Sequence, residues 1–172
     1  MKPRLATLTV MIFAAAILRM LPHPPNFEPI GAMALFAGAH LTGKRWALMI
    51  PLAALFLSDV FIGFHDQMLI VYGAFALVVC LGFSLREHRT AGPVAIAGLA
   101  GATLFFVLTN FGVWAFGSLY PKTLAGLVSC YVAAIPFFGS TVAGTLFYTA
   151  VLFGTFALAE SKITRLALSP SQ

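Results

Sequence analysis

Cys80 is the one chemically reactive side chain in the apolar run of residues 75–83. Gly73, Ala76 and Cys80 are spaced so that in a helix they share one face made of small side chains. Such a face either lets a neighbouring helix approach closely or leaves room for a ligand. Because most buried cysteines are inert packing residues, both interpretations of Cys80 remain open. The second cysteine, Cys130, belongs to no paired motif, and the chain has no zinc-binding spacing.

A second group of residues is polar or aromatic and falls in loops, or near the ends of apolar segments, on one side of the layout described below. Its members are Asn26, Phe27, Asp59, His65, Gln67, Tyr72, Asn110, Trp114, Tyr120 and Tyr131. Polar groups at membrane depth are costly and usually face a cavity. We therefore expect a pocket on this side, with Phe27, Trp114 and Tyr120 as walls or lids. The alternative is that Asp59 and Asn110 only cap or bridge helices.

The composition identifies the surroundings in which these residues must act. The chain has 172 residues, of which 60% are hydrophobic and 9% charged, and its mean hydropathy is +0.98. A soluble domain is about 45–50% apolar and about 25% charged. The sequence therefore predicts an all-α, polytopic membrane protein with one transmembrane domain over residues 1–172, and it excludes a soluble, disordered or disulfide-rich chain. We interpret the net charge of +5 as a sign of topology rather than of nucleic-acid binding.

Charges and prolines divide the chain into apolar segments. Four prolines between Pro22 and Pro29 exclude a helix there. The uncharged run of 37 residues at 123–159 exceeds the roughly 20 residues of one span, and Pro121 and Pro136 bracket a shorter piece within it. We expect that piece, residues 123–134, to form a separate half-helix or lid. We expect six transmembrane helices over residues 5–21, 30–42, 46–64, 68–85, 94–116 and 137–158.

The basic residues predict the orientation of this layout. With both termini in the cytoplasm, eight basic residues lie inside and only Arg19 and Lys122 lie outside. This distribution follows the positive-inside rule and places the expected pocket on the outer side. The chain lacks HExxH, GxSxG and GxxxxGK[ST] motifs, so nothing in it identifies a hydrolase or an ATP-driven pump.

Four stretches of the chain resemble a known family. They are RMLPHPPNFEPIGAMALF at 19–36, PLAALFLSD at 51–59, TNFGVW at 109–114 followed by Tyr120-Pro121, and CYVAAIPFF at 130–138. They are similar to small bacterial membrane proteins related to the substrate-binding S-components of energy-coupling-factor (ECF) vitamin transporters. Within that group, the cysteine in the fourth span resembles that of the BtuM-type solitary vitamin B12 transporters.

The resemblance implies an S-component-like bundle in the bacterial inner membrane that binds and takes up cobalamin. It implies that the Cys80 thiolate is the axial ligand of cobalt and that it displaces cyanide from cyanocobalamin, a catalytic role. His23, His65 and Cys130 are alternative ligands. The Ala-xxx-Ala docking pattern of S-components is absent from the first helix, so we expect a protein that works without an ECF module.

Two alternatives to a cobalamin transporter remain open. The protein could bind another small vitamin, with Cys80 merely packing, or it could be a structural membrane subunit without a ligand.

Overall fold

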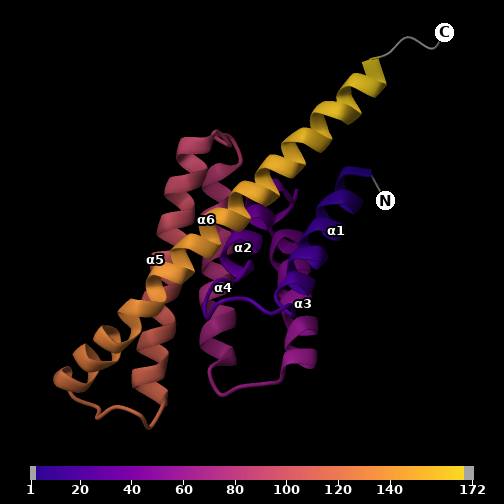
Figure 1. Ribbon diagram of the computed structural model, residues 1–172. Helices are drawn as coiled ribbons and strands as arrows, with labels where there is room; N and C mark the ends of the chain where they lie inside the picture. Colours follow the sequence, from indigo (N-terminus) through magenta and orange to yellow (C-terminus); the bar gives the residue numbers. More distant parts are fainter. Residues whose placement is uncertain (1–2, 169–172) are drawn as a thin grey trace.

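The computed structural model describes residues 3–168, which fold into helices joined by short turns and loops (Figure 1). The expected all-α fold is confirmed for this range. In chain order the helices are α1 (Pro3–Leu18), α2 (Ile30–His40), α3 (Lys44–Ile62), α4 (Met68–Gly82), the 3-10 helix η1 (Phe83–Leu85), α5 (Ala91–Phe116) and α6 (Leu124–Leu168).

The short helix α2 is the centre of the bundle. Ten of its 11 residues are buried, and it contacts each of the other α-helices. It meets α4 where Gly38 faces Gly82. The approach is close: a Cβ atom built on Gly82 would lie only 2.5 Å from the carbonyl oxygen of Leu35. Arg86 then closes the end of α2. Its Nε donates to the carbonyl oxygen of Gly38 and its Nη2 to that of Leu41, both at 3.1 Å. Carbonyl groups at the end of a helix need such partners from outside the helix. Small residues and one arginine thus hold α2 and α4 together.

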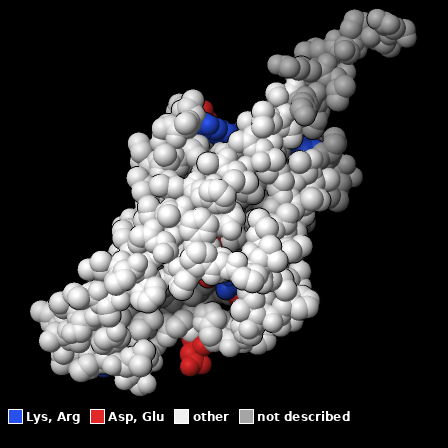
Figure 2. All heavy atoms as spheres, viewed as in Figure 1, with Lys and Arg blue, Asp and Glu red and all other residues white. Residues whose placement is uncertain are grey.

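Four helical segments are long and apolar enough to cross a membrane: α3, α4 with η1, α5, and residues 124–161 of α6. By the length and composition of its helices, the chain is compatible with a multi-pass helical membrane protein. The other two are shorter, with 16 residues in α1 and 11 in α2. At 1.5 Å per residue, α2 extends over about half of a hydrocarbon core of about 30 Å. Charged atoms are sparse on the face shown in Figure 2, as lipid contact requires.

The expected separate half-helix over 123–134 is wrong, because α6 is one continuous helix of 45 residues. Pro136 lies inside α6 without ending it, just as Pro51 lies inside α3. Proline removes one backbone hydrogen bond, but helices in membranes tolerate this when neighbouring groups compensate. In Figure 1, α6 crosses the bundle diagonally and extends past it.

The helices alternate in direction. The start of α1, the end of α6 and the α4–α5 turn lie toward one end of the molecule in Figure 1, and the α3–α4 and α5–α6 loops lie at the other. Most of the polar residues that the sequence predicts to line a pocket lie toward this second end.

Candidate functional site

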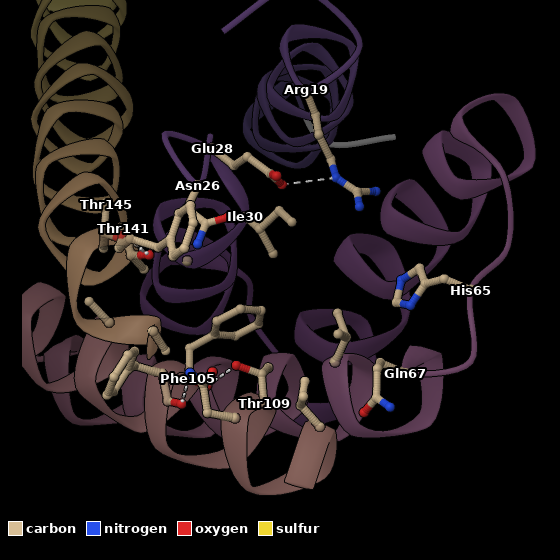
Figure 3. A pocket seen from close by; sticks show the side chains of 18 residues that line it. Arg19, Asn26, Glu28, Ile30, His65, Gln67, Phe105, Thr109, Thr141 and Thr145 are labelled. Carbon is tan, nitrogen blue, oxygen red and sulfur yellow. Dashed lines mark hydrogen bonds and ion pairs between the residues drawn. The ribbon is translucent and has the colours of Figure 1, made fainter. Parts of the chain in front are cut away.

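A cavity of about 330 Å³ opens between the loop after α1, the α3–α4 loop and helices α2, α4, α5 and α6 (Figure 3). Most of its wall is apolar, and its polar groups come from segments far apart in the sequence. Its lining residues are Arg19, Asn26, Glu28, Ile30, Gly31, His65, Gln67, Val71, Ala102, Phe105, Phe106, Thr109, Asn110, Val113, Ala134, Phe137, Thr141 and Thr145.

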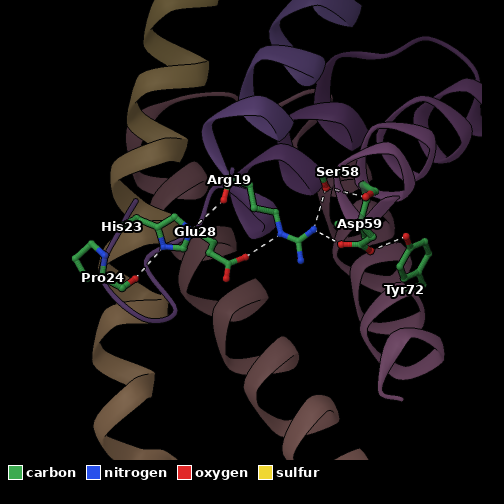
Figure 4. Close-up of polar contacts among 8 residues, drawn as sticks. Arg19, His23, Pro24, Glu28, Ser58, Asp59 and Tyr72 are labelled. Atoms are coloured by element: carbon green, nitrogen blue, oxygen red, sulfur yellow. Dashed lines mark hydrogen bonds and ion pairs between the residues drawn. The ribbon is translucent and has the colours of Figure 1, made fainter. Parts of the chain in front are cut away.

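Arg19 is the centre of a charged network at one side of the cavity (Figure 4). Its Nε donates to Glu28 at 3.2 Å, and its Nη1 donates to Asp59 and, at 2.9 Å, to the hydroxyl of Ser58. Tyr72 donates to the other oxygen of Asp59 at 2.7 Å. The side chain of Asp59 is 1% exposed and that of Arg19 is 11% exposed. Two carboxylates therefore share one guanidinium, and this pairing offsets the cost of burying the charges of Arg19 and Asp59.

The loop between α1 and α2 holds two cavity residues in place. His23 lies within hydrogen-bond distance of two backbone carbonyls, those of Pro24 at 3.0 Å and Arg19 at 3.2 Å. Asn26 has a φ of 61°, a left-handed conformation that asparagine tolerates better than most residues. The Phe27 ring packs 5.7 Å from the rings of both Phe147 and Tyr148 on α6. Phe27 thus anchors the loop on α6, and its neighbours on either side, Asn26 and Glu28, line the cavity.

Along α5 and α6, three polar side chains of the lining bond to the backbone of their own helices. The hydroxyl of Thr109 donates to the carbonyl of Phe105 at 2.8 Å, and the amide of Asn110 donates to that of Phe106 at 2.8 Å. The hydroxyl of Thr141 donates to its own helix in the same way, at 3.1 Å. The two threonine hydroxyl hydrogens and one of the two amide hydrogens of Asn110 are therefore occupied, whereas the oxygens of all three side chains can still accept.

The structure brings six of the ten residues expected to contact a ligand to this site. Asn26, His65, Gln67 and Asn110 line the cavity, and Asp59 and Tyr72 stand directly behind Arg19. Phe27 belongs to the anchor of the loop rather than to the lining.

The other three residues of the expected set do not line the cavity: Trp114 and Tyr120, expected as walls or lids, and Tyr131, expected as a polar contact. Trp114 donates from its indole to the carbonyl of Pro121 at 2.9 Å, and Tyr131 donates to the carbonyl of Val107 at 2.7 Å. Lys122 donates to the carbonyls of Trp114 and Gly117 at the end of α5. Trp114 and Tyr131 thus fasten α5 to the loop and helix that follow it, and Tyr120 lies in that same α5–α6 loop.

Neither cysteine lines the cavity. Cys80 is exposed on α4, on the same open face as Gly73, beside which no atom would lie within 4 Å of an added Cβ. Cys130 is buried, and its thiol lies 3.5 Å from the backbone carbonyl of Asn110. Within residues 3–168, no three His, Cys, Asp or Glu side chains lie close enough together to hold a metal ion.

The residues predicted from the sequence to line the site do not include Arg19 and Glu28. A signal for Arg19 was available, because a carboxylate within an apolar span, such as Asp59, requires a positive partner, and Arg19 is the basic residue at the same end of a neighbouring span. The threonines and phenylalanines of α5 and α6 carry no comparable signal, since such residues occur on every face of both helices.

Over the described residues, the fold and this cavity define an all-helical protein with four helices long and apolar enough to cross a membrane and a buried charge network beside a small internal space. The chain belongs to the family described as "Family of unknown function (DUF6580)", which matches residues 1–167. No curated protein and no solved structure shows a significant match to the chain.

Proposed function

We propose that this protein binds a small organic molecule in the cavity and takes it up across the membrane in the manner of an S-component. The observation that carries the proposal is the placement of Arg19 and Glu28, a charged pair in a mostly apolar space between helices. Charged groups in such a setting generally face a cavity or a pathway and serve a function.

The size and lining of the cavity support a ligand of modest size. Small-molecule sites commonly measure about 300–1,000 Å³ and combine apolar walls with a few polar groups. At about 330 Å³, this cavity is near the lower limit. A small vitamin suits it better than a whole corrin ring with its rim of amides.

The same proposal includes six spans, cytoplasmic termini and a cavity that opens to the outer side of the bacterial inner membrane. Lys44 and Arg45 begin α3, and Arg86 and Arg89 lie in the turn before α5, all at the end opposite the α3–α4 and α5–α6 loops. The positive-inside rule then assigns the cavity to the outer side. In this arrangement α1 and α2 each cross only part of the bilayer, and α2 does so inside protein.

The experiment is a thermal-shift screen of the purified protein in detergent with thiamine, riboflavin, biotin, pantothenate, nicotinamide and cyanocobalamin. The blocking variant is Ala134→Phe, because Ala134 lines the cavity. The matched control is Ala133→Phe, because Ala133 is exposed one position earlier on the same helix. We expect at least one compound to stabilise the wild type and Ala133→Phe but not Ala134→Phe. If no compound stabilises the wild type, the structural-subunit alternative is the better one. If a compound stabilises Ala134→Phe as much as the wild type, it binds outside the cavity and the cavity is not its site.

A second candidate function is cobalamin binding with Cys80 as the cobalt ligand. The observation that favours it is the open, small-residue face of α4, where Cys80 is exposed and Gly73 has free space beside it. A ligand on this face would lie outside the cavity. Protein purified from cells supplied with cobalamin should then be coloured and show corrin absorption bands.

A further inference from the structure

We propose that the ligand of the cavity is a small organic cation that donates hydrogen bonds, such as an ammonium or amidinium compound with an apolar or aromatic body. This inference rests on the proposed function and adds the chemical class of the ligand. The argument has three parts: the charge balance of the site, its supply of hydrogen-bond acceptors, and its walls.

The charge balance of the site is negative. Among the described residues, Arg19 is the one Lys or Arg that lines the cavity, and it is bonded to both Glu28 and Asp59. These three groups, one positive and two negative, carry a formal net charge of −1. Because a carboxylate without compensation is costly in a partly dry space, a bound cation would stabilise the site and an anion would destabilise it.

The unused hydrogen-bonding groups include several acceptors, one of them charged. Glu28 uses one carboxylate oxygen for Arg19, which leaves the other free within the described part of the chain. The buried Oε1 atom of Gln67 has no hydrogen-bond partner among the described residues. Asn110 donates one of its two amide hydrogens to its own helix, which leaves its Oδ1 to accept. The donors that remain are Nη2 of Arg19, the second amide hydrogen of Asn110, the side-chain amides of Asn26 and Gln67, the Thr145 hydroxyl and a ring N–H of His65. The unpaired carboxylate oxygen is the one free charged acceptor among these groups, and a cationic donor satisfies it best.

Arg19 does not provide the usual binding site for an anion. A guanidinium recognises a carboxylate or phosphate through two parallel N–H groups. In this structure Nε and Nη1 are already taken by Glu28 and by Asp59 with Ser58. An anionic ligand would have to displace a carboxylate of the protein.

The walls suit a cation with an apolar body. Phe105, Phe106 and Phe137 line the cavity, with Ile30, Val71 and Val113 completing much of the apolar surface. The faces of aromatic rings attract cations, more strongly when water is excluded. The apolar body would lie among these side chains while the charged group meets Glu28.

The test uses three probes of nearly equal shape and different charge: benzamidinium, benzamide and benzoate. Binding to the full chain in nanodiscs is measured by calorimetry at about pH 8, where histidine is neutral. We expect benzamidinium to bind most tightly, benzamide more weakly and benzoate weakest. Glu28→Gln keeps the shape and an acceptor for Arg19, and it should weaken benzamidinium binding by roughly tenfold and benzamide binding by much less. Glu87→Gln, at the opposite end of α4, is the control and should change neither.

The outcomes separate this inference from the proposed function. If benzamide or benzoate binds as tightly as benzamidinium and Ala134→Phe abolishes that binding, the cavity binds small molecules but the cation inference is wrong. Absence of binding by all three probes also overturns the cation inference, whereas the proposed function is decided by the vitamin screen. A thermal unfolding midpoint of Glu28→Gln close to that of the wild type shows that this variant is folded, and an equal loss of benzamidinium and benzamide binding in it would overturn the cation inference.

Discussion

Arg19, just after α1, and Asp59, in the last turn of α3, form an ion pair that is almost completely shielded from solvent, with side-chain exposures of 11% and 1%. The pair joins two helices at the depth of the cavity and connects the cavity to Tyr72 on α4. Charges in such a place need each other, since desolvation opposes each of them alone. This relationship makes Arg19 both a structural residue and part of the cavity wall.

Removing one partner of this pair should destabilise the protein strongly. Asp59→Leu leaves the Arg19 guanidinium with Glu28 as its remaining charged partner, and we expect a loss of about 3–5 kcal/mol of unfolding free energy. The double variant Arg19→Met, Asp59→Leu removes both charges and should lose less than Asp59→Leu alone. The measurement is reversible unfolding in detergent.

A control for this prediction is the pair of Arg4 with Glu160, whose side chains are 39% and 43% exposed. Arg4→Gln should change the stability by less than about 1 kcal/mol, as is usual for exposed pairs. If Asp59→Leu is equally mild, the buried pair does not stabilise the bundle.

The contact between α2 and α4 predicts opposite effects for two glycines on one helix. In Gly82→Ala, the new methyl group would meet the carbonyl oxygen of Leu35 at 2.5 Å, so the helices must separate and we expect a loss of at least about 1–3 kcal/mol. In Gly73→Ala, no atom lies within 4 Å, so the higher helix propensity of alanine should leave stability unchanged or raise it by up to about 1 kcal/mol. Thermal unfolding of both variants checks this pair, and equal effects would contradict it.

Helix boundaries were largely predictable from the sequence because charges and prolines interrupt the apolar runs. The expected segment 30–42 corresponds to α2, which ends at His40, and 94–116 corresponds to α5, which begins at Ala91 with Pro93 in its first turn. The predicted helix boundary at Pro136 was wrong, since a proline in a membrane helix does not have to end the helix. Whether it does depends on packing around the helix, which the local sequence does not contain.

The site was predictable where residue type alone decides, and less so where geometry decides. Asn26, His65, Gln67 and Asn110 line the cavity, as polar residues near the ends of apolar segments are expected to do. Trp114 and Tyr131 have the same character, but their polar atoms bond to backbone carbonyls outside the cavity. No sequence pattern distinguishes an aromatic residue that fastens two helices from one that faces a ligand.

His40 at the end of α2 offers a test of a buried polar group. It is 6% exposed, lies among Phe36, Phe153 and Phe156, and neither of its ring nitrogens has a hydrogen-bond partner among the described residues. Because an unsatisfied buried group is destabilising, His40→Phe should raise the unfolding free energy by about 1 kcal/mol, whereas His40→Gln should not. A lower stability of His40→Phe would show that the imidazole has a partner, such as an ordered water.

The proposed orientation predicts which loops can be labelled from outside the cell. In a background with Cys80→Ser and Cys130→Ser, His65→Cys should react with a thiol reagent that cannot cross the membrane, whereas Glu87→Cys should react only after the cells are opened. Both positions are exposed, so accessibility is limited by the membrane and not by the fold. Labelling of the Glu87 position in intact cells would overturn the orientation.

The cobalamin candidate makes its own prediction for Cys80. Cys80→Ser should fold normally, because the side chain is exposed and a hydroxyl can bond back to the carbonyl four residues earlier. It should lose cobalt ligation, since a hydroxyl is a harder and much less acidic ligand than a thiol. With cyanocobalamin, the wild type should shift the corrin absorption bands as its thiolate replaces cyanide on cobalt, and the thiol proton leaves with cyanide as hydrogen cyanide.

Three comparisons make this last prediction decisive. Cys130→Ser should behave like the wild type, because Cys130 is 2% exposed and lies between α5 and α6. Ala134→Phe should also release cyanide, because Cys80 does not line the cavity that this variant fills. If Cys130→Ser abolishes the spectral shift and Cys80→Ser retains it, Cys130 is the ligand. If both serine variants retain the shift, neither thiol is required, and His65 and His23 become the ligands to replace next.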